Sequence, residues 1–249
     1  MAAQLRVSSS SDFETLEDDS SPLNGKDGNR NNAITLDKGV SLDDVFNRMG
    51  FGKYQLILTV NMCLVGFAEG AQIIVSTLSG NILQNQWRFD NYTTSLIASC
   101  FFVGVLVGSG VSGFFADKYG RYKPIMFSLL LMTIFNAISG FAWNVMSFGF
   151  TRTVLGFLMG FFSPLGFTMV AENLPVRSRG KVVMIAAGCM FVGEMFACLL
   201  AYFVVDNLVE GDWRALTFLS TGFFLLPLIL NYMYLEESVR YTIIMGNFD

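Results

Sequence analysis

The sequence contains no histidine, and only 14% of its 249 residues are charged. The missing histidine leaves little basis for a Ser-His-Asp triad or for a His-ligated metal site. The chain also has no nucleophile–base set and no phosphate-binding glycine loop, so we predict neither an enzyme, nor a cofactor, nor a metal site. The formal net charge of −4 argues against binding to nucleic acid.

Cysteine is scarce as well. All four cysteines fall inside apolar runs, which predicts buried free thiols that pack like small hydrophobic side chains: Cys63, Cys100, Cys189 and Cys198. What the chain has in abundance is apolar surface, since 53% of its residues are hydrophobic and 25 are phenylalanine. This composition is typical of a protein dissolved in lipid.

The pattern along the chain divides it into four parts. Residues 1–40 are rich in Ser, Asp, Asn and Gly, which predicts a disordered cytoplasmic tail. Residues 41–53 place apolar side chains on one helical face and predict an amphipathic helix on the membrane surface. Residues 54–240 predict a six-helix transmembrane bundle, and residues 241–249 predict the start of a cytoplasmic linker.

Six apolar segments are each long enough to cross a bilayer, which takes about 20 residues. The sequence places them near 54–79, 95–116, 124–142, 146–170, 182–205 and 215–235. The fold class is therefore an all-α membrane protein. Glycines on the second and fourth segments predict close helix contacts: Gly104, Gly108, Gly113, Gly156 and Gly160.

Basic residues predict the orientation of the bundle. They concentrate in the loops and ends that are cytoplasmic if both termini are cytoplasmic, whereas the outer loops hold only Arg88 and Arg214. Trp87, Trp143 and Trp213 then fall at the outer interface. Asn91 begins an outer glycosylation sequon, which lies close to the second segment.

The loop from Gly113 to Pro124 reads G-x-x-x-D-K-x-G-R-x-K-P and joins two apolar segments. Gly120 permits a turn that a Cβ would resist, and Asp117 is placed to pair with the neighbouring bases Lys118 and Arg121. The pattern resembles the signature loop of the major facilitator superfamily of solute transporters.

Two further stretches extend the resemblance. Glu172 to Gly180 matches the E-x-x-P-x-x-x-R-G pattern of sugar porters, and residues 236–241 occupy the place of their P-E-S-P-R motif with both prolines replaced. Other short stretches look most like the synaptic-vesicle-two-related branch, which is akin to organic-ion transporters. The resemblance covers residues 41–249 and implies two three-helix inverted repeats, half of a twelve-helix fold.

The resemblance also implies a cytoplasmic gate, in which opposite charges tie helix ends together in one conformation and release them in another. The predicted gate residues are Gly113, Asp117, Lys118, Gly120, Arg121, Glu172, Arg179, Glu237 and Arg240. The alternative is a static set of partly solvated ion pairs, each contributing about 0–1 kcal/mol.

Charges inside the apolar segments are rare and point to function. Glu69 and Arg152 are predicted to reach similar depths, which makes an ion pair between them plausible, and Gln72 shares the face of Glu69. Glu194 lies near mid-membrane, where it is a candidate proton carrier. These four residues are the predicted substrate or ion pathway. The alternative is a structural ion pair together with one protonated acid.

The leading hypothesis is the N-terminal half of a transporter that moves a small organic solute or ion by alternating access, with proton coupling as an option. The alternative is a non-transporting membrane protein that acts as a receptor, scaffold or trafficking factor. Either would reside in the plasma membrane or an intracellular vesicle. The expected partners are the bilayer, the solute, and a C-terminal six-helix half or a second copy, because alternating access needs two bundles. We accordingly expect a truncated or dimerising half.

Overall fold

The computed structural model describes residues 51–205 and 211–235, and within these residues it contains six α-helices. In chain order they are α2 (Lys53–Trp87), α3 (Asn91–Tyr119), α4 (Tyr122–Gly140), α5 (Val145–Asn173), α6 (Val176–Val204) and α7 (Trp213–Tyr234). Each is long and apolar enough to cross a membrane, which confirms the predicted fold class. The predicted tail, the linker and most of the predicted surface helix lie outside the described residues.

Local chemistry explains several of the helix ends. Gly120 ends α3 with a φ of 82°, in the region that favours glycine, so the predicted turn is confirmed. Pro175 stands at the N-cap of α6, where its missing N–H removes no helical hydrogen bond. Asp212 caps α7, because its carboxylate accepts hydrogen bonds from the backbone N–H groups of Arg214 and Ala215.

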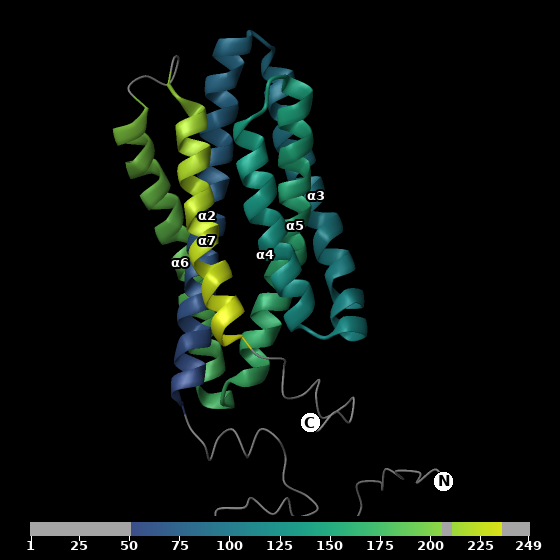
Figure 1. The fold of residues 1–249 in the computed structure, drawn as a ribbon, viewed down its shortest axis with the longest axis vertical. Helices are drawn as coiled ribbons and strands as arrows, with labels where there is room; N and C mark the ends of the chain where they lie inside the picture. The colour runs from purple at the N-terminus through teal and green to yellow at the C-terminus, as the bar shows by residue number, and fades with distance from the viewer. Residues whose placement is uncertain (1–50, 206–210, 236–249) are drawn as a thin grey trace, which may run out of the picture. The chain divides into compact units, whose positions relative to one another are not determined.

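The two halves of the bundle interlock. In Figure 1, α2, α6 and α7 lie on one side and α3, α4 and α5 on the other, so each side mixes helices from the first three and the last three. The most extensive contacts join α3 to α5 and α2 to α6, and these two pairs are equivalent if α2–α3–α4 is superposed on α5–α6–α7. This arrangement is that of two three-helix repeats packed into one bundle.

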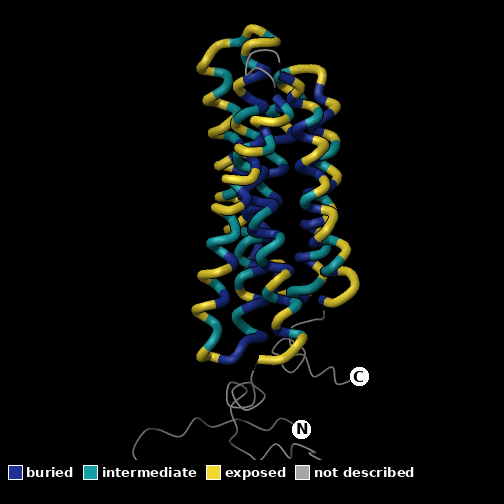
Figure 2. The backbone as a smooth tube through the Cα atoms, turned by 90° about the vertical axis from the view of Figure 1, so that its left-hand side faces the viewer, coloured by how far each residue is buried: buried dark blue, intermediate teal, exposed yellow. Residues whose placement is uncertain are grey.

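Helices α2 and α5 form the centre of the bundle. More than half of the most apolar stretch of each is buried, against about a fifth for α3 and α6. Figure 2 shows the same division, with buried positions inside and exposed positions on the flanks. Large apolar side chains such as Leu106, Met195 and Tyr202 are exposed, as expected of surfaces that contact lipid or another protein.

Glycines allow the two equivalent helix pairs to touch through their backbones. A Cβ added to Gly108 would lie 2.1 Å from the carbonyl oxygen of Phe157, and one added to Gly156 would lie 2.1 Å from that of Phe101. A Cβ added to Gly70 on α2 or to Gly193 on α6 would likewise lie 2.0 Å from a backbone carbonyl oxygen of the facing helix. The close contacts predicted for Gly104, Gly108, Gly156 and Gly160 are therefore confirmed.

The structure corrects two expectations about packing. A Cβ at Gly113 would meet no atom of the described chain within 4 Å, so Gly113 makes no close helix contact there. The four cysteines are free thiols as predicted, but none is fully buried, and Cys198 is exposed. The reason is shared: Gly113 and Cys198 lie on α3 and α6, the helices with the least buried apolar stretches.

Candidate functional site

Glu69 is an acidic side chain in the middle of α2 and is only 6% exposed. Its carboxylate accepts a hydrogen bond from the hydroxyl of Ser163 on α5, which lies 3.0 Å from Oε1 and 3.1 Å from Oε2. A neutral hydroxyl offsets part of the desolvation of this carboxylate without supplying an opposite charge.

Arg152 is the largest fully buried side chain of the described residues, with 1% exposure. Its Nη1 donates to the hydroxyl of Ser76 on α2 at 2.9 Å, and its guanidinium carbon lies 4.6 Å from the centre of the Phe148 ring. Its Nε and Nη2 are buried and have no acceptor among the described residues. Arg152 thus retains two donor nitrogens without an acceptor inside the bundle.

The predicted Glu69–Arg152 ion pair is wrong in this structure, because each charge binds a serine on the helix of the other. The prediction failed because the two residues lie at different depths in the bundle. Glu69 lies about 24 Å from the start of α2 and Arg152 about 32 Å from the end of α5, at 1.5 Å per residue. Helix α2 also continues to Trp87, eight residues beyond the predicted end at 79, which moves Glu69 closer to the middle of its helix.

Gln72 belongs to a polar chain that runs through the bundle. It is fully buried, and its Nε2 donates to Asn136 Oδ1 on α4 at 2.9 Å and to Ser76 Oγ at 3.4 Å. Asn136 Nδ2 in turn donates to Ser220 and Thr221 on α7, at 2.9 and 3.2 Å. With the Arg152–Ser76 bond, hydrogen bonds connect α5, α2, α4 and α7 in series.

Glu194, the third predicted membrane charge, lies on α6 and is half-buried. Within the described residues it has no hydrogen-bond or ion-pair partner, in contrast to Glu69. It therefore takes no part in the hydrogen bonds described above. Its role as a proton carrier stays a prediction.

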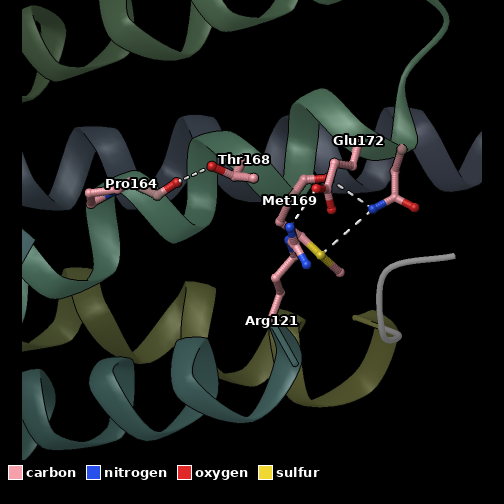
Figure 3. Close-up of polar contacts among 6 residues, drawn as sticks. Arg121, Pro164, Thr168, Met169 and Glu172 are labelled. Atoms are coloured by element: carbon pink, nitrogen blue, oxygen red, sulfur yellow. Dashed lines mark hydrogen bonds and ion pairs between the residues drawn. The ribbon is translucent and has the colours of Figure 1, made fainter. Parts of the chain in front are cut away.

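An ion pair joins two of the predicted gate residues at the end of the bundle that carries the α3–α4 turn. Arg121 Nη2 lies 2.6 Å from Glu172 Oε1 (Figure 3). Both side chains are largely buried. Glu172 stands in the last turn of α5, where a negative charge is unfavourable with respect to the helix dipole. The cation at Arg121 compensates for that placement and links the α3–α4 turn to α5.

The other predicted gate residues are dispersed around this pair. Asp117 is exposed and has no ion-pair partner among the described residues, so its expected pairing with the neighbouring bases is not formed. Lys118 lies over the Tyr119 ring, 5.2 Å from its centre, and Arg179 Nη2 donates to the carbonyl of Leu174 at 3.3 Å. Glu237 and Arg240 lie outside the described residues.

Asn91 is the first residue of α3, and its side-chain oxygen accepts a hydrogen bond from Gln84 Nε2. Trp87 and Trp213 lie at this end of the bundle, with ring centres 6.0 Å apart. This is the predicted outer end. Glycosylation of Asn91 stays a prediction.

Sequence reasoning did not select the neutral partners of the buried groups, which are Ser76, Asn136, Ser163, Ser220 and Thr221. A signal was present for two of them. Ser76 follows Gln72 by four residues and therefore lies on the same helical face. Asn136 is an amide inside an otherwise apolar segment, and such polar residues commonly hydrogen-bond between membrane helices.

The fold and the motifs together define a multi-pass integral membrane protein of the major facilitator superfamily, not an enzyme. Residues 41–249 match the family model described as "Sugar (and other) transporter", so the chain belongs to that family. It is 31% identical over 214 residues to the Caenorhabditis elegans protein svop-1 and 30% identical over 215 residues to the bovine synaptic vesicle 2-related protein.

These similarities cover most of this chain and a smaller part of the relatives. The two alignments span 85% and 86% of the chain but 40% and 38% of the respective relatives. Among solved structures, the D-xylose-proton symporter superposes with a TM-score of 0.67 at 20% identity, over 78% of this chain and 51% of that one. At that identity the likeness shows the fold alone.

Proposed function

We propose that this chain forms the N-terminal six-helix bundle of a transporter that moves a small organic solute or ion by alternating access. The observation that carries the proposal is the pair of buried charges, Glu69 and Arg152, each held by a single serine rather than by an opposite charge. Charges at such depth are unfavourable in a purely structural bundle, and in membrane proteins they mark solute and ion pathways. Gln72 extends the same polar region.

A second six-helix bundle is the partner that this mechanism requires. Alternating access rocks two bundles about a shared site, and the chain spans about two fifths of the length of its curated relatives. We propose that the partner is a C-terminal half or a second copy. In either case it covers part of the exposed apolar surface of α3 and α6.

The cytoplasmic gate is the second part of the proposal. Arg121 and Glu172 hold the α3–α4 turn against α5, and α5 also carries Arg152 and Ser163. A displacement of α5 that breaks the ion pair at one end therefore changes the surroundings of both buried charges. Asp117, Lys118 and Arg179 supply further charges at the same end, and Glu69 or Glu194 carries the proton if transport is proton-coupled.

The proposed location is an intracellular vesicle or the plasma membrane, with both termini cytoplasmic. The orientation is supported by the basic residues near the α3–α4 turn and by the tryptophans at the opposite end. The vesicle is supported by similarity to a protein named for the synaptic vesicle.

Radiotracer uptake tests the proposal. Cells that produce the complete gene product are supplied with a panel of organic cations and anions at two external pH values. We expect uptake of at least one solute, with a large loss in Glu69→Gln and Arg152→Gln and little change in Arg214→Gln, which removes an exposed charge from α7. No flux of any solute, with the protein verified in the membrane, would support the receptor or scaffold alternative instead.

The gate is tested separately by reversing its charges. Arg121→Glu or Glu172→Arg alone places like charges together and is expected to reduce uptake, and the double reversal is expected to restore part of it. Lys123→Gln, which changes an exposed cation at the start of α4, serves as the control. A double reversal no better than either single change would contradict the gate.

A further inference from the structure

The buried guanidinium of Arg152 borders a cavity of about 90 Å³ between α2, α3 and α5. The volume equals that of about three water molecules, at roughly 30 Å³ each. The cavity opens beside exposed residues Thr77 and Asn81 on α2 and Ala98 on α3. It is a small, partly open recess in the half of the bundle that also contains Trp87 and Trp213.

The chemistry of the cavity wall is one-sided. Arg152 contributes a cation whose Nε and Nη2 lack an acceptor among the described residues, and Thr77, Asn81 and Thr94 contribute polar side chains. The lining contains no acidic side chain. Glu69, the nearest acidic group along α2, is engaged by Ser163 and does not line the cavity.

The positive charge of Arg152 therefore has no negative counter-charge in the cavity. Nε and Nη2 belong to one planar guanidinium, and a planar carboxylate accepts two parallel hydrogen bonds from such a group. Both nitrogens are covered by surrounding atoms, so binding requires a small shift of the guanidinium towards the cavity. The remaining wall is apolar, with Ile73, Ile97 and Phe101, and suits a short hydrocarbon stem.

We propose that this cavity binds the carboxylate group of a small organic anion, with Arg152 as its anchor. The cavity beside Arg152 holds the carboxylate and the first carbons of the ligand. The rest of a larger ligand extends out of the cavity through the opening at Thr77 and Asn81. This assignment deepens the proposed transport function by naming the charge class of the solute, and rests on that function only in treating the anion as cargo.

Tryptophan fluorescence can report on binding at this site, because aromatic rings connect Arg152 to Trp213. Phe148 lies under the Arg152 guanidinium and packs edge-on against Trp213, with ring centres 5.8 Å apart, and Trp213 contacts Trp87. Neutralisation of Arg152 by a bound anion therefore changes the surroundings of these aromatic rings.

The test measures equilibrium binding and does not need transport. The 249-residue chain in lipid nanodiscs is titrated with formate, acetate and propionate against chloride, which carries no carboxylate, at constant ionic strength, and tryptophan fluorescence and Tm are recorded. Acetamide is the neutral control ligand. We expect a saturable fluorescence change and a rise of several degrees in Tm with acetate but not with acetamide, because a ligand that binds only the folded state stabilises it.

Variants assign the effect to the cavity. Arg152→Gln is expected to abolish the acetate response, and Lys123→Gln, which removes an exposed cation far from Trp213, is expected to retain it. Since Arg152→Gln removes a buried group and can affect folding, Ala98→Phe provides a second variant that narrows the opening and leaves Arg152 in place. Loss of the response in Ala98→Phe, with Tm in chloride unchanged, supports the site.

An acetate response that persists in both cavity variants, or that is equally strong with acetamide, would overturn the assignment. So would the absence of any response to all three carboxylates in the wild-type chain. Binding without uptake of any anion by the complete gene product would leave this site standing and count against the transport proposal, so the two failures are distinguishable.

Discussion

Along the α3–α5 interface the helices touch through their backbones, whereas at the junction of α2, α4 and α7 they are joined by polar side chains. In the first region Gly108 and Gly156 leave so little room that a Cβ would overlap the facing carbonyl group. In the second, Asn136 alone accepts a hydrogen bond from Gln72 on α2 and donates to Ser220 and Thr221 on α7. The two regions lie in one bundle but involve different helices.

The difference shows two ways of associating helices where lipid is as apolar as the side chains. Without a hydrophobic driving force between helices, association depends on dispersion contacts between closely approaching backbones or on interhelical hydrogen bonds. The glycine contacts fix the distance between helices. The Asn136 junction fixes their register and rotation, because a hydrogen bond forms only in one geometry.

The largest expected effect comes from adding volume to the glycine interface. Gly108→Ala and Gly156→Ala must separate α3 from α5, since the new methyl group would lie 2.1 Å from a backbone oxygen. We expect each change to lower the unfolding free energy by about 1–3 kcal/mol or more, measured by denaturant titration in nanodiscs.

Gly110→Ala is the matched control on α3, because a Cβ at Gly110 would meet nothing within 4 Å. It is expected to be neutral or stabilising by up to about 1 kcal/mol, the difference in helix propensity. Equal destabilisation by all three alanines would show that helix packing is not the reason.

A smaller effect is expected at the polar junction. Asn136→Leu replaces the amide with an apolar side chain, deprives Gln72 Nε2 of its acceptor on α4 and removes both bonds to α7. We expect a loss of about 1–2 kcal/mol in the same titration. Ser128→Ala on the same helix removes only a hydroxyl bonded to the carbonyl of Ile125 and is expected to have less effect. A wild-type stability in Asn136→Leu would mean that the junction contributes nothing to association.

The smallest expected quantity is the coupling between the two buried charges. Glu69 and Arg152 have separate partners, so the effects of Glu69→Gln and Arg152→Gln on unfolding free energy are expected to add within about 0.5 kcal/mol. The measurement is a double-mutant cycle. A coupling well above 1 kcal/mol would restore the direct pair that the sequence suggested.

Much of the local architecture could be predicted before the structure. The turn at Gly120 follows from the sequence because only glycine adopts its φ of 82° without strain. The glycine spacing on α3 and α5 indicated close contact, but it did not separate Gly108, which meets a backbone, from Gly113, which meets nothing described. That distinction depends on which face of α3 turns towards α5, and all faces of α3 are similarly apolar.

The sequence by itself determined the six spans, because the apolar length needed to cross a bilayer is a local property of each segment. It also marked Glu69, Arg152 and Gln72 as unusual, since charge and amide groups are unfavourable in lipid wherever they face. Only the tertiary structure decided their partners. The length, offset and rotation of the helices place Ser163 against Glu69, Ser76 against Arg152 and Asn136 against Gln72. A hydrogen bond forms only when donor and acceptor lie within a narrow range of distance, and the sequence of one segment does not determine its distance from another.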